Sequence, residues 1–586
     1  QHTAKLPPVF AMIDVLQLKS VQVHCCAVRL CALVYFFAFL GNVIDGPVMW
    51  LLTPPRGWDS AQLVAWNKMA LLPSVIVFLR PWFWPALAVC WIIWYQTHSS
   101  GGQWFYFGWD AMMDEIGFLA CILSITLTLY DDIEVDPDAM EPILDEQEEE
   151  TEPAIQPSHH EATGDSALRS RRHRQSPKQE SSPSRTKEEA PPSAFAWQML
   201  WISFSPQKTS SSIRRCSQLV EWCRILAELS LTLAAFRLFL AAGLLKMRIG
   251  SACWKTLTCL YDHYETQPMP NFAAWMFHNY TPHPLLSAMQ WFAIDLAECV
   301  VPFFLLSFML SMGPLGFLHR QLLQRKEWFF RMPAKVPARL IASIVIVVFV
   351  FGMYVGGNYA FLHPLAIVSL VASMGTVQGT AVIRKPESKA MTAYRSIMPC
   401  LVLLLLLFAF LPSLRAFAWL WSGSERLDFL EPLMRSDFVK QAKSLNLGIP
   451  YNHHAYFAGA VHQRNEMVLL ADVGEGYVEV DIPYKVGRVD RMPLQTSPLH
   501  RRFAWQWWFI GLGQDPSWLV NFMELLCKKN DIAWQAVEYN GTVHNQLQKL
   551  KRVAAQMYKY HFSKPGSSVW WQRVEVRGQR IELPCK

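Results

Sequence analysis

The chain has 586 residues, of which 52% are hydrophobic and 17% charged, with 25 tryptophans and a net charge of +6. A soluble chain of this length would normally form several domains with about 25% charged residues. The apolar residues instead form long blocks, which indicates a polytopic α-helical membrane protein with soluble additions. The small net charge, made of blocks of both signs, gives nucleic-acid binding no support.

Residues 1–26 are predicted to form an N-terminal cytoplasmic segment. Gln1 to Lys19 contains no basic region followed at once by an apolar stretch, so we expect no cleavable signal peptide. The first membrane helix then acts as the insertion signal. Lys19 and Arg29 flank the start of the first apolar block and favour a cytoplasmic N-terminus.

Residues 27–130 are predicted to form a first membrane helix bundle. Its apolar segments are Ala27 to Val43, Met69 to Leu79, Trp82 to Trp94 and Glu115 to Tyr130. The middle two are short for a membrane span and are separated by Arg80 and Pro81. They form either a helical hairpin that turns at Arg80 or one broken, re-entrant element, and we favour the hairpin.

Residues 131–195 differ from both flanking regions in composition. They are acidic first and then basic and rich in serine and proline, with almost no aromatic residues. Such a segment buries too little apolar surface to offset its ordering entropy, so we predict a disordered cytoplasmic linker. Its serines next to arginines are candidates for phosphorylation, but a solvated linker is the favoured interpretation.

Residues 196–421 are predicted to form a second membrane helix bundle. Its apolar segments are Leu219 to Leu245, Leu285 to Met312, Leu340 to Tyr354, Leu362 to Met374 and Ile397 to Trp421. Two basic groups lie between these segments: Arg320, Arg325, Lys326, Arg331, Lys335 and Arg339, and then Arg384, Lys385, Lys389 and Arg395. Basic loops favour the cytoplasm. About nine membrane segments follow, with a lumenal loop at 246–284 and a lumenal C-terminus.

Residues 422–586 are predicted to form a lumenal, β-rich soluble domain. Met467 to Val486 alternates around Gly474 and Gly476 and is typical of a β-hairpin, whereas Pro516 to Lys528 and Asn545 to Met557 look helical. The domain also carries five clustered tryptophans: Trp505, Trp507, Trp508, Trp570 and Trp571. They form either an exposed client-binding patch or part of a β-rich core, and burial is favoured.

The polar stretch from Cys253 to Asn271, with the sequence CWKTLTCLYDHYETQPMPN, lies between two apolar segments. Its Cys-Trp pair, its second cysteine and the run from His263 to Pro268 resemble the signature loop of the lipase maturation factor family. Further similar stretches are Phe107 to Asp110, Glu115 to Leu119, Phe236 to Lys246, Val300 to Phe303, Gly357 to Phe361, Ser497 to Phe509, and Tyr558 to Arg573. One departure is Ala504, where the family pattern leads us to expect an acidic residue.

This resemblance covers about Arg29 to Phe118 and Leu219 to Pro584. It implies an endoplasmic-reticulum membrane chaperone that helps secreted lipases fold and assemble by binding them, without catalysis, cofactor or metal. Its partners would be membrane lipids and lipase clients. The residues that define the loop or contact clients would be His263, Tyr264, Glu265, Thr266, Gln267, Pro268 and Asn271.

Two other function classes stay open at this point. The first is a structural accessory subunit of a larger membrane complex. The second is a membrane-embedded enzyme that uses His263 and Glu265, because a histidine near a carboxylate can shuttle protons. Alternation would place both side chains on one side of an extended strand. No nucleophile elbow, zinc-ligand spacing or phosphate-binding loop accompanies them, so hydrogen bonds that shape the loop are the favoured role.

Four charged residues lie inside predicted membrane segments: Glu228, Arg237, Asp295 and Glu298. Charges in a bilayer are costly and should pair with one another or face a polar cavity. We predict that Arg237 pairs with Asp295 or Glu298 and so ties together the two helices that flank the loop. A substrate or ion pathway is the alternative.

The chain has 13 cysteines, most of them in or beside predicted spans. Four remain on the predicted lumenal side, where disulfides are permitted. We expect the pairs Cys253–Cys259 and Cys527–Cys585, with four free thiols as the alternative. The predicted glycosylation sites are Asn279 and Asn540, whose Asn-X-Thr sequons both fall on the side interpreted as lumenal.

Overall fold

The computed structural model describes residues 20–129, 211–306, 338–374, 389–422, 431–448, 458–537 and 549–585. Internal contacts divide the chain into one unit of residues 1–131 and 212–586 and another of residues 132–211. The first unit contains the described helices and strands, apart from Ser211 at the start of one helix. The predicted linker, the first basic group except Arg339, and most of the N-terminal segment lie outside the described residues.

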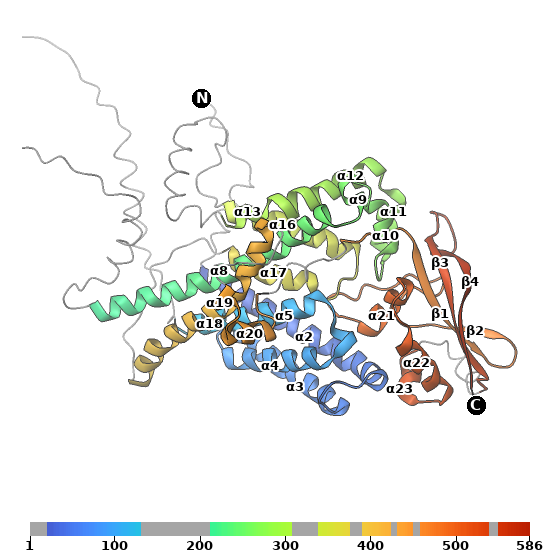
Figure 1. The fold of residues 1–586 in the computed structure, drawn as a ribbon, viewed down its shortest axis with the longest axis horizontal. Coiled ribbons are helices and arrows are strands. Elements are labelled where there is room, and N and C mark those ends of the chain that lie inside the picture. The colour runs from blue at the N-terminus through green and yellow to red at the C-terminus, as the bar shows by residue number, and fades with distance from the viewer. Residues whose placement is uncertain are drawn as a thin grey trace, which may run out of the picture. The chain divides into compact units, whose positions relative to one another are not determined.

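The N-terminal helices pack as neighbours, in the blue region of Figure 1. They are α2 (Ser20–Leu52), α3 (Ser60–Leu79), α4 (Trp84–Ser100) and α5 (Gly108–Leu127), with the short 3-10 helix η1 (Gly102–Phe105) before α5. A buried polar chain joins three of them, because the Asn42 amide donates to Asn67 and the Asn67 amide donates to Thr97, each at 3.0 Å. Such bonds between apolar helices satisfy polar groups where water is absent.

The predicted hairpin at Arg80 is confirmed. Helix α3 ends at Leu79, where the Arg80 N–H still donates to the Ile76 carbonyl, and α4 starts at Trp84 with a proline in its first turn. Proline suits this position because the first N–H groups of a helix have no partner within the helix. The Ser124 hydroxyl of α5 donates to the Pro81 carbonyl at 2.6 Å and holds the turn in place.

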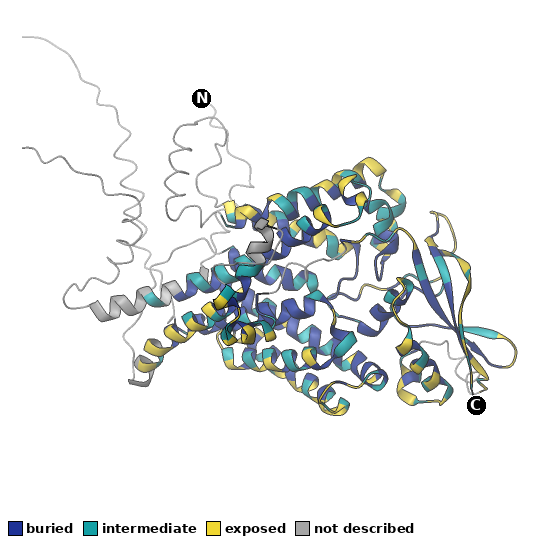
Figure 2. Cartoon of the chain, viewed as in Figure 1, coloured by how far each residue is buried: buried dark blue, intermediate teal, exposed yellow. Residues whose placement is uncertain are grey.

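A second set of helices continues the bundle: α8 (Ser211–Arg248), α9 (Ala252–Lys255), α10 (Leu260–Thr266), α11 (Phe272–Tyr280), α12 (His283–Trp291), the π-helix η3 (Phe292–Val300), α13 (Pro302–Leu305), α16 (Ala338–Gly356), α17 (Leu362–Ser373) and α18 (Lys389–Ser422). Helix α17 packs against α2, α5 and α16, and α18 packs against α5. The N-terminal and later helices therefore share one hydrophobic core, dark blue in Figure 2.

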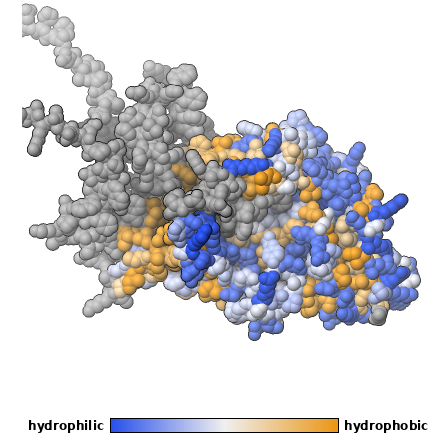
Figure 3. Space-filling model, viewed as in Figure 1, coloured by the Kyte–Doolittle hydropathy of each residue, from blue (hydrophilic) through white to orange (hydrophobic). Residues whose placement is uncertain are grey.

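Six helical stretches among the described residues are long and apolar enough to cross a membrane: Gln22–Leu52, Ser60–Leu79, Cys223–Arg248, His283–Leu305, Ala338–Gly356 and Ser396–Arg415. Large apolar side chains on α3, α16 and α18 remain exposed in the chain, as expected for a lipid-facing surface, and exposed apolar residues are orange in Figure 3. The polytopic α-helical fold class with a C-terminal soluble region is confirmed, and the count of nine segments stays a prediction.

The C-terminal region contains a four-stranded antiparallel sheet in the order β2-β1-β3-β4, built from β1 (Arg464–Asp472), β2 (Tyr477–Val480), β3 (Arg552–Phe562) and β4 (Trp571–Pro584). Strands β1 and β2 form the predicted hairpin, with Leu469 opposite Val480. Helices α21 (Arg502–Gly511) and α22 (Ser517–Cys527) pack against the sheet, and α23 (Asp531–Gln535) packs against α22. The short helices α19 (Glu431–Met434) and α20 (Asp437–Ser444) lie next to α18 in the helical bundle. Helix α22 confirms the helix predicted over Pro516 to Lys528.

Two predictions for this region need correction. The helix predicted from Asn545 to Met557 is wrong where the structure describes it, because β3 begins at Arg552 and pairs with β1 and β4 on both sides. Pairing in the middle of the sheet overrides the helix preference of Ala554 and Ala555. The tryptophans of the 505–508 cluster are buried, as favoured, but they lie on helix α21 and not in a strand.

Candidate functional site

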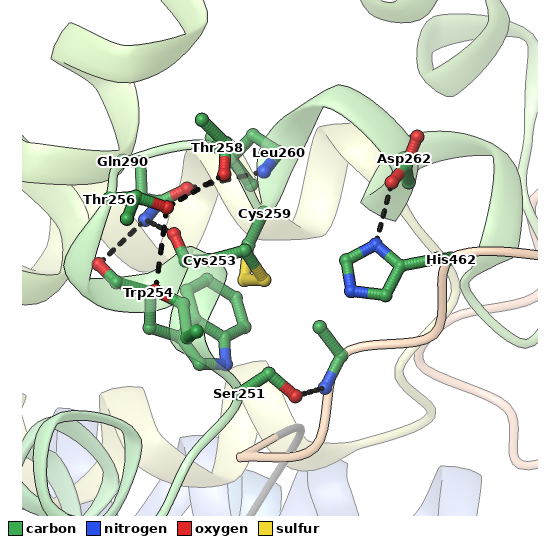
Figure 4. Close-up of a disulfide and its surroundings, with 12 residues drawn as sticks. Ser251, Cys253, Trp254, Thr256, Thr258, Cys259, Leu260, Asp262, Gln290 and His462 are labelled. Atoms are coloured by element: carbon green, nitrogen blue, oxygen red, sulfur yellow. Dashed lines mark hydrogen bonds and ion pairs between the residues drawn. A yellow bond between two sulfur atoms is a disulfide. The ribbon is translucent and has the colours of Figure 1, made fainter.

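The stretch from Cys253 to Asn271 contains the short helices α9 and α10. A disulfide joins Cys253 to Cys259, with their Cα atoms 4.8 Å apart (Figure 4). The Ser251 hydroxyl accepts from the Ala460 N–H at 2.8 Å, and the Trp254 indole donates to the Ala458 carbonyl at 2.9 Å. The start of the stretch is therefore bonded to the segment that leads into the sheet.

Gln290 of α12 satisfies main-chain groups at both ends of the disulfide loop. Its amide nitrogen donates to the carbonyls of Cys253 and Trp254 at 3.1 and 3.0 Å, and its side-chain oxygen accepts from the Leu260 N–H at 3.2 Å (Figure 4). Gln290 is fully buried, where unsatisfied main-chain groups are costly. One side chain thus fixes the entry to α10.

Arg464 of β1 binds the other end of α10. Its guanidinium donates to the carbonyls of Glu265 at 2.9 Å, Gln267 at 2.5 Å and Pro268 at 2.8 Å, and to the carboxylate of Glu466 at 2.6 Å. The last carbonyls of a helix have no partner within the helix. Arg464 supplies a donor for the Glu265 carbonyl of α10 and for the carbonyls of Gln267 and Pro268 that follow the helix, and its side chain is fully buried.

Two asparagines complete this contact. Asn271 caps α11 by accepting from the Ala274 N–H at 2.9 Å, and its amide donates to the Val355 carbonyl at 2.8 Å. Asn358 donates to the carbonyls of Met269 and Leu494 at 3.0 Å each. Its side-chain oxygen accepts from the main-chain N–H of Thr496 at 2.6 Å. The turn after α16 therefore joins the 253–271 stretch to the C-terminal region.

The extended arrangement expected for His263 and Glu265 is wrong, because both lie on helix α10. Two residues along a helix point in nearly opposite directions, so the pair cannot share one face. His263 shares a hydrogen bond of 2.9 Å with the Tyr359 hydroxyl, which donates to Gln267 at 2.7 Å. Burial, assisted by the charge of Lys246, lowers the pKa of His263 to about 4.

Glu265 instead faces strand β3. Its carboxylate accepts from the Phe562 N–H at 2.8 Å and lies 3.0 Å from His561 Nδ1. The His263–Glu265 acid/base pair is therefore absent, and each side chain connects α10 to a different neighbour. This geometry agrees with the loop-shaping role that the sequence favoured.

The remaining residues of the run have local or packing roles. The Tyr264 ring stacks on Phe277 with centroids 5.2 Å apart, and the Thr266 hydroxyl donates to the Asp262 carbonyl one turn earlier at 3.0 Å. The Thr266 carbonyl accepts from the Trp508 indole at 3.0 Å. Helix α21 therefore also contacts the end of α10.

A second buried arginine joins the C-terminal region to the first helices. Arg502 at the start of α21 forms a two-pronged ion pair with Asp110 of α5, at 2.6 and 2.8 Å. It also donates to the Trp104 carbonyl at 2.9 Å and to Asn42 at 3.1 Å, and its guanidinium lies 3.8 Å from the centre of the Phe105 ring. Arg502 and Asp110 are both fully buried.

The predicted pairing of Arg237 with Asp295 or Glu298 is wrong. Arg237 pairs with Glu115 of α5, and Glu298 accepts from Lys246 with both oxygens at 2.7 Å. Arg237 and Lys246 are nine residues apart, which is two and a half helical turns, so they project from opposite faces of α8. Lys246 alone therefore faces η3, while Arg237 ties α8 to the first group of helices.

The other two intramembrane acids differ in their surroundings. Glu228 accepts from Arg339 at 2.6 Å and Arg224 at 3.3 Å and lies 3.1 Å from His24. Asp295 lies on η3 with one buried oxygen that has no hydrogen-bond partner among the described residues. Glu228 thus connects three helices, as expected for a charge that stabilises a bundle.

A second disulfide joins Cys527 at the end of α22 to Cys585 after β4. Eight other cysteines in the described part of the chain are free thiols. The Asn279 amide donates to the carbonyls of Trp275 and Ser563, and Asn540 lies outside the described residues. Within the residues that the structure covers, no group of three or more His, Cys, Asp or Glu side chains is placed to hold a metal ion.

The sequence did not single out Arg464, Asp110 or Gln290 as site residues. Arg464 stands in a stretch of ordinary mixed polarity, and its partner Pro268 is 196 residues away. Asp110, Asn358 and Arg502 lie in stretches that were noted for their family resemblance. All five of these side chains carry buried charged or amide groups, which require hydrogen-bond partners. Nothing in the neighbouring sequence identifies those partners.

Comparison with protein families agrees with the resemblance seen in the sequence. Residues 200–326 match the lipase maturation factor transmembrane domain, and residues 451–580 match the lipase maturation factor C-terminal domain. The 253–271 stretch lies within the first match. Arg464 and Arg502 lie within the second. The resemblance to the family is therefore confirmed.

Curated relatives carry the same family name. The chain is 25% identical over 382 residues to lipase maturation factor 1 of Bos taurus, and 25% identical over 381 residues to that of Homo sapiens. It is also 25% identical over 418 residues to lipase maturation factor 2 of Rattus norvegicus. Each match covers 58% of this chain and 58% of the relative. No solved structure matches the chain.

Proposed function

We propose that this chain, which resembles the lipase maturation factor family, is an endoplasmic-reticulum membrane chaperone that assists the folding and assembly of secreted lipases. The observation that carries the proposal is that hydrogen bonds of Arg464 and Asn358 join the 253–271 stretch to the C-terminal region. A binding platform needs such rigidity, because a surface ordered in advance loses less entropy when it binds a client.

The proposed client contact is an exposed stripe on α11. Phe272, Met276 and Tyr280 are spaced four residues apart and therefore share one face of the helix. Their exposed fractions are 52%, 44% and 61%. Apolar surface of this kind next to polar surroundings marks interaction sites, and folding intermediates expose apolar surface that it can cover.

Ring contacts connect this stripe to the C-terminal region. Trp275 lies 5.3 Å from Trp570 and 6.0 Å from Phe272, measured between ring centroids, and Phe272 lies 5.8 Å from Trp570. The two family domains thus contribute to one aromatic surface. Aromatic side chains are favoured in contact sites because they bury a large area with few rotatable bonds.

The proposed topology places the N-terminus in the cytoplasm and residues 246–284 and 422–586 in the lumen. Both disulfides lie in the regions assigned to the lumen, and an oxidising compartment preserves such bonds. A glycan on Asn279 that endoglycosidase H removes would support this assignment. Protection of the 131–195 linker from protease added outside intact microsomes would contradict it.

The test of function is expression in cells that lack their own lipase maturation factors, together with a secreted dimeric lipase. We expect the double variant Phe272→Ser and Met276→Ser to lower secreted lipase activity several-fold while the variant's own abundance is unchanged. Leu494→Ser is the control, because Leu494 is 68% exposed, more than either stripe residue, but lies outside the stripe. If both variants lowered secreted lipase activity equally, the proposal that clients bind the stripe would be wrong.

A mild-detergent pull-down from native membranes distinguishes the chaperone from an accessory subunit of a larger complex. Substoichiometric secretory lipases in the eluate would support the chaperone. A fixed set of membrane subunits at constant ratio would reject it.

A further inference from the structure

A cavity of about 490 Å³ lies among helices α8, α10, α12, η3, α16 and α17. Helix α8 lines it with Leu238, Ala242 and Lys246, which are spaced four residues apart and so share one face. Eight residues separate the first from the last, which is about 12 Å along a helix. Helix α16 adds a wall of the same length, from Val348 to Gly356. The cavity is therefore an elongated space between two membrane helices.

The cavity reaches the lipid-facing surface between α12 and α16. Leu285 of α12 and Val348 of α16 line it and are each more than half exposed. Gly352 of α16 also lines it, and a Cβ added there would meet no atom within 4 Å. The opening is therefore bordered by apolar side chains and a glycine, so that a hydrocarbon chain in the bilayer can enter from the side.

Three polar side chains that line the cavity make their hydrogen bonds within the protein. The Gln267 amide donates to the Gly356 carbonyl at 2.7 Å, and the Tyr359 hydroxyl donates to Gln267, also at 2.7 Å. Gln290 is bonded to main-chain groups at the disulfide loop, as described above. A molecule in the cavity therefore needs no polar group to satisfy these three side chains.

The charges in the cavity oppose an ionic head group. Lys246 and Glu298 are the charged side chains that line it, and they bind each other at 2.7 Å. Their charges cancel, so neither an anionic nor a cationic head would find an unpaired partner of opposite charge among the residues that line the cavity. A buried ion without a partner is strongly disfavoured, so the head group of a lipid would remain outside.

The walls of the cavity are mostly apolar and aromatic, with Phe239, Phe292 and Phe349 among them. Apolar cavities exclude water and bind apolar molecules. A hydrocarbon chain that moves from the bilayer into the cavity loses no contact with water. It also supplies the dispersion contacts that the walls of an empty space lack. An elongated apolar space that is open to the bilayer thus fits a lipid chain.

From these observations we infer that the cavity binds one acyl chain of a membrane lipid, which enters between α12 and α16, lies along α8 and packs against α10. Leu260, His263 and Tyr264 of α10 line the cavity, so the chain would contact the 253–271 stretch directly. Two sources share this chemistry: a free fatty acid and a chain of a phospholipid. Phe272 and Met276 of the α11 stripe do not line the cavity, so the inference does not depend on the proposed function.

The test uses the full chain, purified in digitonin and freed of lipid, because digitonin has no alkyl chain that could occupy the cavity. The probes are palmitate with a photoreactive diazirine on its chain and a phosphatidylcholine that carries the same chain. Mass spectrometry identifies the labelled residues. Phe239 and Ala242 line the cavity and are only 4% and 7% exposed, so labelling there reports a chain inside the cavity.

We expect saturable labelling of Phe239 or Ala242, and the probe that saturates at the lower concentration identifies the source. Unlabelled lipid of the same kind should compete. Leu72 of α3 is 66% exposed and reports lipid at the outer surface, where labelling should rise in proportion to the probe. If both probes label Leu72 but neither labels Phe239 or Ala242 in a saturable way, the inference is overturned.

A variant at the opening locates the site. Gly352→Phe closes the opening and should lower labelling of Phe239 at least fivefold while labelling of Leu72 is unchanged. Ile344→Phe is its matched control, since Ile344 is 42% exposed on the same helix, about two turns earlier, and does not line the cavity. Thermal unfolding checks that both variants fold. Equal labelling of Phe239 in wild type and folded Gly352→Phe would overturn the entry path and with it the site.

Hydrogen exchange tests the contact with α10. Saturating unlabelled lipid should slow exchange in α10 at least twofold in the wild type, and it should have no such effect in Gly352→Phe. If exchange in α10 did not change although Phe239 was protected from labelling, the proposed contact between the chain and α10 would be wrong.

Discussion

Two of the places where the C-terminal region meets the helices are each centred on a fully buried arginine. Arg464 donates mainly to main-chain carbonyls of the 253–271 stretch, whereas Arg502 binds the carboxylate of Asp110. Carbonyls occur at every residue, so the Arg464 contact selects a backbone conformation. A carboxylate belongs to one side chain, so the Arg502 contact selects a residue pair. The two contacts should therefore respond differently to substitution.

The largest effect is expected for Arg502→Met. This change leaves the Asp110 carboxylate buried without its partner and should lower the free energy of unfolding by about 3–5 kcal/mol. The double variant Arg502→Met and Asp110→Leu should recover more than half of the loss, because it removes the isolated charge. Thermal unfolding in detergent measures both, and a double variant as unstable as the single one would contradict this account.

Arg464→Met should cost about 2–3 kcal/mol, since it leaves several buried carbonyls without donors. Here the matched double variant with Glu466→Leu should not recover stability, because the carbonyls of Glu265, Gln267 and Pro268 remain. Hydrogen exchange at residues 264–268 should rise in both variants. If the double variant regained stability, Arg464 would act mainly through its carboxylate partner, as Arg502 does, and the proposed difference between the two contacts would be wrong.

Loss of the Cys253–Cys259 disulfide should have a smaller effect. Its cysteines are six residues apart, and closing so short a loop stabilises a chain by about 2 kcal/mol. The double variant Cys253→Ser and Cys259→Ser should raise hydrogen exchange in the 253–271 stretch and leave residues 502–511 unchanged. An equal rise of hydrogen exchange in the 253–271 stretch and in residues 502–511 would show that the Arg464 and Arg502 contacts open together.

The smallest effect concerns His263. Its pKa of about 4 lies below the ordinary value of about 6.5, so the unfolded chain binds a proton first as the pH falls. The stability that this residue contributes is complete above about pH 6.5 and is lost progressively toward pH 4. Between pH 7.5 and 5.5 the loss should be about 1 kcal/mol. His263→Gln should remove this part of the pH dependence, and an unchanged pH profile would contradict it.

Local pattern predicted much of the fold. Long apolar blocks predicted the membrane helices, Arg80-Pro81 between two short blocks predicted the hairpin of α3 and α4, and alternation around Gly474 predicted β1 and β2. Each of these features depends on residues close together in the chain. The run from His263 to Pro268 was likewise noted from neighbouring residues, by resemblance to a family.

Pairings across the chain could not be predicted in the same way. Charge rules require that Arg237 have a partner, but the choice of Glu115 over Glu298 depends on which face of α8 meets α5. The helix expected up to Met557 became strand β3 because β1 and β4 were available on both sides. In both cases the deciding group lies far away in the sequence.

The sequence by itself determined which segments avoid water, where they turn, and that a polar stretch rich in aromatic residues and prolines separates two of them. Hydrophobicity and turn chemistry are local properties, so they can be read from one short window at a time. The tertiary structure alone decided that Arg464 holds that stretch and that Arg502 reaches Asp110. Those outcomes depend on which distant surfaces pack together, and only the folded chain sets those distances.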